Sequence, residues 1–508
     1  MDLTSLIANM SAGFGVALSP DKLAFGLLGV VIGTAVGVLP GLGPSVAIAL
    51  LLPLTFGLDP TTAFILFGGI YYGTMYGGST TSILINTPGD AASSVSTFEG
   101  YPMAKRGLGG VALATSAIGS FIGGTFATFM LMLAASSLAA ATLWFGPPEY
   151  FAMMVLALAM VTGMAGKSLP RALFALSLGL GLAMVGIDMQ TGANRLTFGV
   201  QELYGGIDVA LGAVGLFAVG EALWLIASPP EGEFERMPTN RLWLTADEWR
   251  RSAIPWIRGT VVGFCSGLLP GTGATFATFL SYGVERKFSK HPEQFGKGAI
   301  EGLAGPEAAN NAAAGASMVP LLALGIPGSA TTAVMLVAFQ LYGLQPGPTL
   351  METNKDLVWG LIASLYVANV LLVIINLPLV GLWVQLLRIP RGLLTAIILV
   401  FSTVGAYSLQ GSLGDVVIVW LLGVAAFLLR RFGFPIAPVL LGLVLGPMLE
   451  QDLRRSLAMS SGDFGIFLTR PIALAVFALI AILAVYRVAG LVRGRRAGVL
   501  PTEQGRVN

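Results

Sequence analysis

Residues 37–45 read GVLPGLGPS, and residues 267–275 read GLLPGTGAT. The second stretch follows the first by 230 positions, and both lie inside long apolar segments. Proline lacks the backbone N–H and clashes with the preceding turn, while glycine removes conformational restraint. The two stretches therefore predict that two membrane segments are broken in the same way, which a simple membrane-spanning helix does not explain.

The composition is that of a membrane protein. Of 508 residues, 55% are hydrophobic and 11% charged, and the mean hydropathy is +0.81, whereas soluble domains carry about 25% charged residues. Apolar stretches long enough to cross a bilayer recur along the chain. We expect an all-α polytopic membrane protein, so the net charge of +2 informs topology rather than nucleic-acid binding. One Cys and one His give no basis for a Cys/His metal site, and no cofactor is expected.

Lysine and arginine predict the topology. We interpret residues 24–57 and 257–283, which contain the broken stretches, as re-entrant hairpins. This places 22 of the 28 basic residues on the cytoplasmic side, with the N-terminus outside and the C-terminus inside. Whether residues 434–449 span fully is left open. About eleven transmembrane helices are expected, at residues 61–98, 108–141, 148–166, 170–187, 207–228, 298–343, 356–387, 391–408, 413–430, 434–449 and 470–491.

One hairpin followed by five crossings occurs twice in this assignment. The loops that carry basic residues in one half lack them in the other, so the two halves are expected to have inverted topology. Inverted repeats are typical of transporters, whose site lies near the midplane between the repeats. The expected divisions are an N-terminal segment at 1–23, repeats at 24–228 and 257–449, a cytoplasmic linker at 229–256, and a final helix with a basic tail at 450–508.

A second shared break follows each hairpin. Residues 85–90 read INTPGD and residues 324–330 read LGIPGSA, with Pro88 and Pro327 separated by 239 positions. Lipid offers no partners for the freed backbone groups, so such breaks are expected to line a cavity. A helix N-terminus there suits a carboxylate, and the carbonyls at a helix end suit Na⁺. Few basic residues lie near the breaks, so we expect helix ends, hydroxyls and amides to hold an anion.

Two acidic residues in these polar runs have two possible roles. Asp90 either caps the following half-helix or binds a coupling cation or proton. Glu307 has the same alternatives, and Ser79 and Thr80 are candidate ligands for the same cation. Single hydroxyl residues in membrane helices also serve close packing. Glu221, near an inner helix end, is interpreted as structural.

Three long motifs resemble a known family. GVLPGLGPSVAIALLLPLTFGLDPTTA, GGIYYGTMYGGSTTSILINTPGDAASSVSTFEGYPMA and GPEAANNAAAGASMVPLLALGIPGSATTAVML are similar to the large membrane subunit of tripartite tricarboxylate transporters, over about residues 20–490. The resemblance implies an elevator-like transporter in the bacterial inner membrane, with a periplasmic N-terminus and cytoplasmic C-terminus. It also implies import of carboxylates such as citrate on a Na⁺ or H⁺ gradient, with a small membrane subunit and a periplasmic solute-binding protein as partners.

The same resemblance assigns the substrate-binding residues. By motif they are Gly41, Gly43, Ser45, Asn86, Thr87, Pro88, Gly89, Gly271, Thr272, Gly273, Thr275, Asn310, Asn311, Pro327, Gly328 and Ser329.

Three alternatives remain. A stand-alone carboxylate transporter of the same architecture would need no binding protein. An intramembrane aspartyl protease would need two facing aspartates, and Asp90 has no evident partner because Asp188 and Asp208 fall in or beside an outer loop. A channel would need a selectivity ring, and the breaks supply no charged one. We therefore expect a secondary active transporter and not an enzyme.

Overall fold

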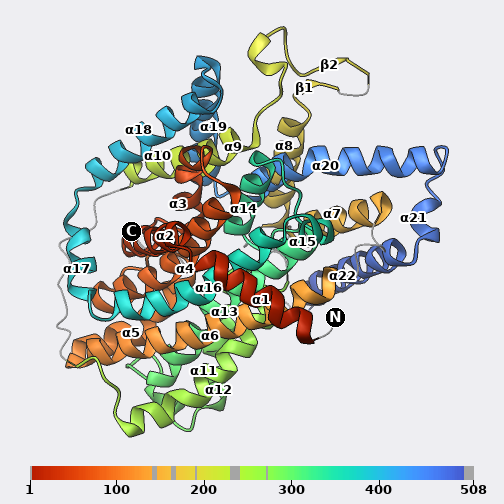
Figure 1. Cartoon of the computed structure of the whole chain (residues 1–508). Helices are drawn as coiled ribbons and strands as arrows, with labels where there is room; N and C mark the ends of the chain where they lie inside the picture. Colours follow the sequence, from red (N-terminus) through yellow and green to blue (C-terminus); the bar gives the residue numbers. More distant parts are fainter. Residues whose placement is uncertain are drawn as a thin grey trace.

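The computed structural model is a bundle of helices (Figure 1), and it describes residues 3–139, 146–161, 168–188, 191–228, 241–269 and 273–496. The first part of the chain forms α1 (Leu3–Ala17), α2 (Pro20–Val38), α3 (Pro44–Leu51), α4 (Pro60–Ile85), α5 (Ser96–Met103), α6 (Gly109–Ala139), α7 (Pro147–Val161), α8 (Leu169–Ala183), β1 (Gly186–Ile187), β2 (Asn194–Arg195), α9 (Val209–Ala213) and α10 (Gly220–Ala227). A 3₁₀ turn at Ala92–Val95 precedes α5, and π-helical turns at Ala104–Leu108 and Val214–Val219 join α5 to α6 and α9 to α10.

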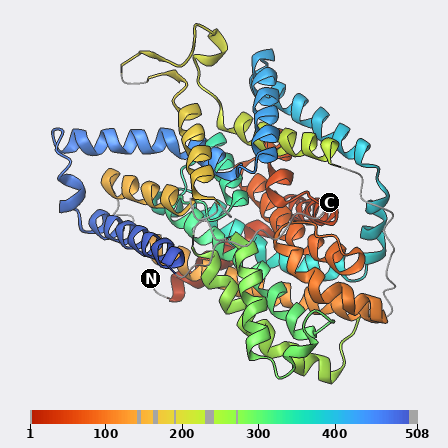
Figure 2. The ribbon, with the colours of Figure 1, turned by 180° about the vertical axis from the view of Figure 1, so that it is seen from behind.

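The remaining helices belong to the part of the chain from residue 241 onward. They are α11 (Ala246–Gly267), α12 (Gly273–Phe288), α13 (Ile300–Leu324), α14 (Ala330–Leu341), α15 (Pro348–Thr353), α16 (Lys355–Asn376), α17 (Val380–Gln385), α18 (Arg391–Gln410), α19 (Leu413–Arg431), α20 (Ala437–Met459), α21 (Ile466–Thr469) and α22 (Pro471–Arg496). Seen from behind, α11 and α12 lie side by side at the lower edge, away from α20 and α22 (Figure 2).

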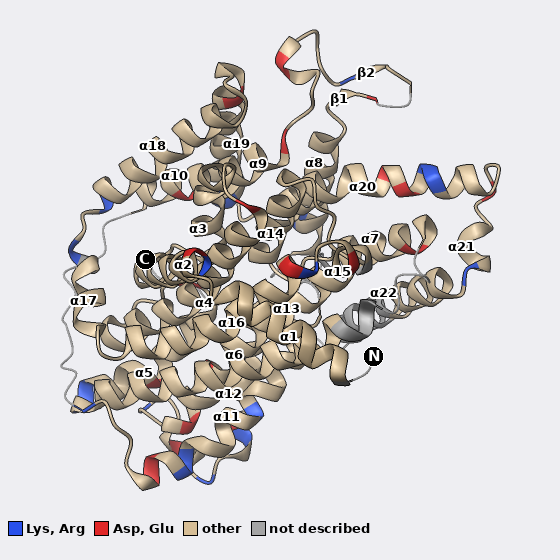
Figure 3. Cartoon of the chain, in the orientation of Figure 1, with Lys and Arg blue, Asp and Glu red and all other residues tan. Residues whose placement is uncertain are grey.

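The described helices fit the expected membrane class. By length and composition six can cross a membrane, namely Pro20–Val38, Ala92–Ala135, Val209–Ala227, Lys355–Asn376, Arg391–Gln410 and Leu413–Arg431. Shorter apolar helices accompany them at Pro147–Ala159, Leu169–Ala183, Ala330–Leu341 and Pro471–Ile482. The ribbons of α4, α6, α13 and α16 cross the centre of the molecule almost without charged residues, which gather around the ends of α11 and α12 and at the edges (Figure 3). The prediction of an all-α membrane protein is confirmed.

Glycines allow α2 and α4 to pack backbone to backbone. A Cβ on any of three α2 glycines would overlap a backbone carbonyl oxygen of α4, and the pairs are Gly29 with Leu66, Gly33 with Ile70 and Gly37 with Thr74. The residue numbers of both helices increase together from one pair to the next, so the two helices run parallel. Since α4 starts at the end where α2 starts, residues 39–59 return the chain to that end, as a hairpin does.

The same packing joins α11 to α13. Here the pairs are Gly259 with Gly305, Gly263 with Ala309 and Gly267 with Ala313. Each α11 glycine lies 230 residues after its α2 counterpart, and each α13 partner lies 239 residues after its α4 counterpart. The middle of α11 is linked to the last turn of α12 by an ion pair between Arg258 and Glu285.

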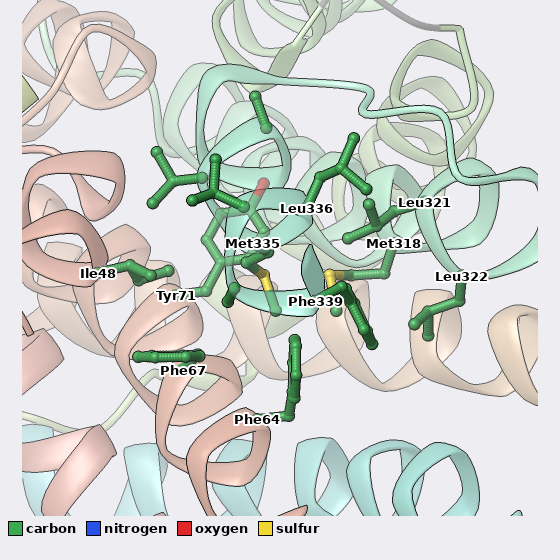
Figure 4. Close-up of a cluster of buried hydrophobic side chains, with 14 of the residues drawn as sticks. Ile48, Phe64, Phe67, Tyr71, Met318, Leu321, Leu322, Met335, Leu336 and Phe339 are labelled. Atoms are coloured by element: carbon green, nitrogen blue, oxygen red, sulfur yellow. The ribbon is translucent and has the colours of Figure 1, made fainter. Parts of the chain in front are cut away.

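The helices α4 and α13 pack against each other in opposite directions. The Ser79 hydroxyl donates to Glu307 over 2.7 Å, whereas the Tyr71 hydroxyl lies 3.1 Å from that of Ser317. Side chains from α4, α13 and α14 interleave in this region (Figure 4), where the rings of Phe64 and Phe339 stack with centroids 3.9 Å apart. The two parallel helix pairs therefore lie antiparallel to one another.

Loops that the sequence places on one side of the membrane lie together. The short hairpin of β1 and β2 is fixed to α20, because Arg195 pairs with Glu450 over 2.9 Å and Arg454 with Asp188 over 3.0 Å. Elsewhere, the buried Glu99 carboxylate accepts backbone hydrogen bonds from Gly296, Gly298 and Ala299. The first group of loops carries the predicted outer charges, and the second lies beside the predicted cytoplasmic ones.

Candidate substrate-binding site

The break after α4 folds the chain back along its own helix. Asn86 adopts the left-handed conformation (φ 57°) that ends α4. A Cβ on Gly89 would overlap the Gly37 carbonyl oxygen and approach the Gly78 Cα to 2.5 Å, so only glycine permits this path. The Gly41 N–H donates to the Gly89 carbonyl over 3.0 Å, which ties the two breaks of the first half together.

The break after α13 has the same construction. Gly325 ends the helix in the left-handed conformation (φ 69°), as Asn86 does 239 positions earlier. A Cβ on Gly328 would lie 3.1 Å from the Ser317 Cβ and 3.5 Å from the Gly267 carbonyl oxygen. The structure therefore repeats the break in detail, including the glycine that approaches the neighbouring hairpin.

Reciprocal caps start the helix after each of these breaks. In the first half, Ser93 N–H donates to Asp90 Oδ1 over 3.0 Å, and Asp90 N–H donates to Ser93 Oγ over 3.2 Å. In the second, Thr332 N–H donates to Ser329 Oγ over 3.2 Å, and Ser329 N–H donates to Thr332 Oγ1 over 2.8 Å. Asp90 thus caps a helix. It also lines the cavity, so its role in binding a coupling cation or proton stays a prediction.

A cavity of about 1180 Å³ lies where the breaks meet. Four helical segments contribute residues of their first turn to its wall: α3, the 3₁₀ turn before α5, α12 and α14. The lining residues of these segments are Gly41, Gly43, Pro44, Ser45, Val46, Pro88, Gly89, Asp90, Ala91, Ala92, Ser94, Gly273, Ala274, Thr275, Phe276, Phe279, Ser329, Ala330 and Thr331. Backbone N–H groups and the positive ends of helix dipoles therefore converge on one space, which suits a small anion.

The rest of the wall comes from helices outside the breaks. It is formed by the helix Val209–Ala227, the end of α19 and the segment that leads into α20, through Leu216, Phe217, Gly220, Glu221, Ala426, Arg430, Phe434, Pro435, Ile436 and Ala437. Tyr71 and Met75 of α4 complete the lining, and the Tyr71 hydroxyl lies 3.5 Å from Ser329 Oγ. Apolar and aromatic side chains thus enclose a small number of polar groups, as in most small-molecule sites.

The predicted site residues divide into three groups. Those that line the cavity are Gly41, Gly43, Ser45, Pro88, Gly89, Asp90, Gly273, Thr275 and Ser329. Those in described segments that do not line it are Asn86, Thr87, Asn310, Asn311, Pro327, Gly328, Ser79, Thr80 and Glu307. Gly271 and Thr272 lie outside the described residues.

Glu307 is buried among hydroxyl groups and does not line the cavity. Its carboxylate accepts hydrogen bonds from Ser79 over 2.7 Å, Ser116 over 2.8 Å and Ser96. Among the described residues none forms an ion pair with it. This single carboxylate therefore holds three helical segments of the first half against α13, and it is also a group that a proton or Na⁺ would neutralise.

Asn310 and Asn311 lie within α13 and are about 1% exposed. Asn311 donates from Nδ2 to the Glu307 carbonyl over 3.4 Å, and its Oδ1 has no partner among the described residues. Neither side-chain atom of Asn310 has a partner in that part of the chain. A substrate in the cavity does not reach them in this conformation, so the role assigned by motif resemblance has no geometric support here.

Two charged lining residues were not among the predicted site residues. We expected few basic residues near the breaks, and one of the described residues, Arg430 of α19, lines the cavity. Glu221, interpreted as structural, lines it as well and pairs with Arg430. The two residues are 209 positions apart and lie at the ends of separate apolar segments, so no local pattern linked them. Tyr71 was also not identified from the sequence, because an aromatic residue in an apolar helix usually belongs to the hydrophobic core.

Comparisons with known proteins agree on one family. The model of the tripartite tricarboxylate transporter TctA family matches residues 23–441. An Agrobacterium vitis protein described as "Uncharacterized 52.8 kDa protein in TAR-I ttuC' 3'region" is 47% identical over 501 residues, which cover 99% of this chain and 100% of that protein. A second, "Uncharacterized protein in TAR-II ttuC' 3'region", is 46% identical over 234 residues, covering 46% of this chain and 97% of its own. No solved structure matches. The chain therefore belongs to the TctA family of tripartite tricarboxylate transporters.

Proposed function

We propose that this chain is the large permease subunit of a binding-protein-dependent secondary transporter that imports tricarboxylates or related organic carboxylates on a cation gradient. A small membrane subunit and a periplasmic solute-binding protein would be its partners in the bacterial inner membrane. The family to which the chain belongs is one of tripartite systems. The observation that carries the proposal is the convergence of four helix starts on one cavity of about 1180 Å³.

An inverted repeat explains how the helix starts come to face one another. The offsets of 230 and 239 residues relate the glycine contacts of α2 and α4 to those of α11 and α13. Since α4 and α13 run antiparallel, the second half would be turned upside down relative to the first. These contacts support a repeat of inverted topology, in which two hairpins and two broken helices meet near the midplane.

The cavity wall also supports an elevator-like movement. The breaks contribute part of the wall, and the helix Val209–Ala227 with α19 contributes another part. A body that carries the four helix starts could move the substrate past a wall that stays with the membrane. In this mechanism the residues of the breaks travel with the substrate, whereas Glu221 and Arg430 do not.

The charges of the cavity favour coupling to a cation. Its charged lining residues in the described segments are Asp90, Glu221 and Arg430, which sum to one negative charge when all are ionised. That charge would repel a carboxylate, because electrostatic interactions are strong in a site of low dielectric constant. A proton or Na⁺ at Asp90, or at the buried Glu307, would remove the excess. Cation and carboxylate would then each strengthen the binding of the other, as symport requires.

Uptake by reconstituted vesicles tests the proposal. The full chain, with a small membrane subunit of the same system, would be placed in liposomes, and labelled citrate would be added with the corresponding solute-binding protein. We expect accumulation that needs all three components and an inward Na⁺ or H⁺ gradient. Uptake that ignores both gradients would show that the coupling is wrong, and absence of uptake for citrate and for a panel of dicarboxylates would refute a carboxylate carrier.

A stand-alone transporter of the same architecture, which needs no binding protein, remains the second hypothesis from the sequence. The same vesicles discriminate between the two. Gradient-driven uptake by the chain alone, unaffected by the small subunit and the binding protein, would favour the stand-alone carrier.

A further inference from the structure

Arg430 is the one basic side chain among the described residues that line the cavity. It lies in the last turn of α19, and its guanidinium stacks over the Trp224 ring with its carbon 4.5 Å from the ring centroid. Its Nη1 donates to Glu221 Oε2, and its side chain remains 38% exposed. A guanidinium has five N–H donors. Glu221 uses one of these donors, and the others have no hydrogen-bond partner in the described part of the chain.

The pairing of Glu221 with Arg430 is incomplete on the acidic side as well. The Glu221 side chain is 11% exposed, and its Oε1 is buried without a hydrogen-bond partner in the described part of the chain. Strong arginine–carboxylate pairs use two parallel hydrogen bonds, whereas this one uses a single nitrogen and a single oxygen. A buried carboxylate oxygen without a donor is unfavourable. The pair is thus one that a second carboxylate can open or join.

The location of the pair fits a contact with the substrate. A Cβ on Gly41 would lie 3.8 Å from Glu221 Oε1, so the pair lies beside the first hairpin break in the cavity wall. The helix starts bring partial positive charge to this wall, and Arg430 adds a full positive charge. A molecule with more than one carboxylate could contact both.

We propose that Arg430 binds one carboxylate of the transported anion, and that Glu221 is the competing carboxylate that holds the guanidinium until the anion replaces it. This deepens the proposed function and rests on it, since it assumes a carboxylate substrate in this cavity. Because Arg430 lies on α19, outside the breaks, the contact forms and breaks as the substrate moves past it. The residue therefore sets preference for anions that have a further carboxylate besides the one held at the helix starts.

The test is citrate binding by the purified full-length chain in lipid nanodiscs, measured by titration calorimetry. Arg430→Gln should weaken citrate binding roughly 10- to 100-fold, the loss expected for a charge-assisted hydrogen bond. Glu221→Gln should strengthen it several-fold, because a competitor and a repelling charge are removed. Arg431→Gln is the matched control, since Arg431 is the adjacent basic residue, is exposed and does not line the cavity. It should bind as the unchanged chain does.

Arg430→Gln and Glu221→Gln are expected to change citrate affinity in opposite directions, which distinguishes a binding role from a structural one. A purely structural ion pair would be broken by either substitution, so equal weakening in Arg430→Gln and Glu221→Gln would overturn the proposal. Arg430→Gln that binds like Arg431→Gln would overturn it too. If the Arg430→Gln variant does not accumulate, Arg430→Lys is tested in its place. We expect Arg430→Lys to bind citrate more weakly than the unchanged chain, and equal binding would contradict the proposal. An unchanged chain that binds neither citrate nor succinate would instead refute the proposed function, and this assignment with it.

Discussion

Gly89 gives the sharpest test of the folded-back breaks. In Gly89→Ala the added Cβ would overlap the Gly37 carbonyl oxygen and lie 2.5 Å from the Gly78 Cα. Both neighbours are backbone atoms of packed helices, so no side-chain rotation relieves the overlap. Overpacking of a rigid core typically costs about 1–3 kcal/mol. A cost of about 2 kcal/mol would reduce the population of the folded-back break roughly 30-fold.

Two other glycines supply a graded series. At Gly328, the equivalent position of the second half, the nearest atom to an added Cβ would be the Ser317 Cβ at 3.1 Å, so a shift of a few tenths of an ångström suffices. At Gly43 no atom lies within 4 Å of the added Cβ, and its backbone (φ −79°) accepts alanine. We expect the loss of function to be severe for Gly89→Ala, intermediate for Gly328→Ala and slight for Gly43→Ala.

The assay is citrate uptake in proteoliposomes, with the unfolding midpoint of each purified variant measured in parallel. Uptake should fall at least about 10-fold in Gly89→Ala, in line with the cost of the overlap, while Gly43→Ala keeps most of it. Equal activity and equal midpoints in these two variants would refute the reasoning, since both glycines line the cavity and only the packing behind them differs.

Three further changes address the same site. Asn86→Ala should lower uptake because alanine is strained by about 1–2 kcal/mol in the left-handed conformation, whereas Asn86→Gly should retain it; equal loss in both would indicate a ligand role for the amide. Asp90→Asn should weaken the dependence of uptake on the Na⁺ or H⁺ gradient with folding intact, because the amide oxygen can still accept from Ser93 N–H; an unaltered gradient response excludes Asp90 as the coupling site. Glu307→Gln should abolish gradient-driven uptake while binding of citrate persists, and normal coupling in this variant would assign Glu307 a structural role.

The sequence predicted the breaks because their cause is local. Proline and glycine act on the backbone at their own positions, so the two motifs 230 residues apart could be identified without coordinates. The glycine rows of α2 and α11 follow the same spacing, and each row predicts a face of close backbone contact. The helix starts at Gly43, Gly273 and Ser329 then follow from the positions of the breaks.

The part of the cavity wall that comes from helices outside the breaks could not be predicted in this way. Arg430 and Glu221 are brought together by the packing of α10 against α19, where small residues such as Gly220 and Gly423 permit close approach. Neither charge is unusual at the end of an apolar segment, where basic residues ordinarily mark the membrane surface. Asn310 is a different case, since this polar residue of the family motif is buried within α13 and does not line the cavity, and its role stays a prediction.

The folding back of the two breaks is what brings them to a common site. Along the antiparallel pair, Tyr71 lies level with Ser317 and Ser79 with Glu307, so the ends of α4 and α13 are about 30 Å apart at 1.5 Å per residue. Each loop then returns by seven residues along its own helix, which places Gly89 beside Gly78 and Gly328 beside Ser317.

Those two levels are separated by only about 10 Å along the helix axis, within the length of a tricarboxylate and its polar contacts. Two antiparallel broken helices without this return would present separate anion sites near opposite surfaces, and a single substrate could not contact both. The glycines behind the breaks, rather than the prolines in them, are therefore the residues that make one shared site possible.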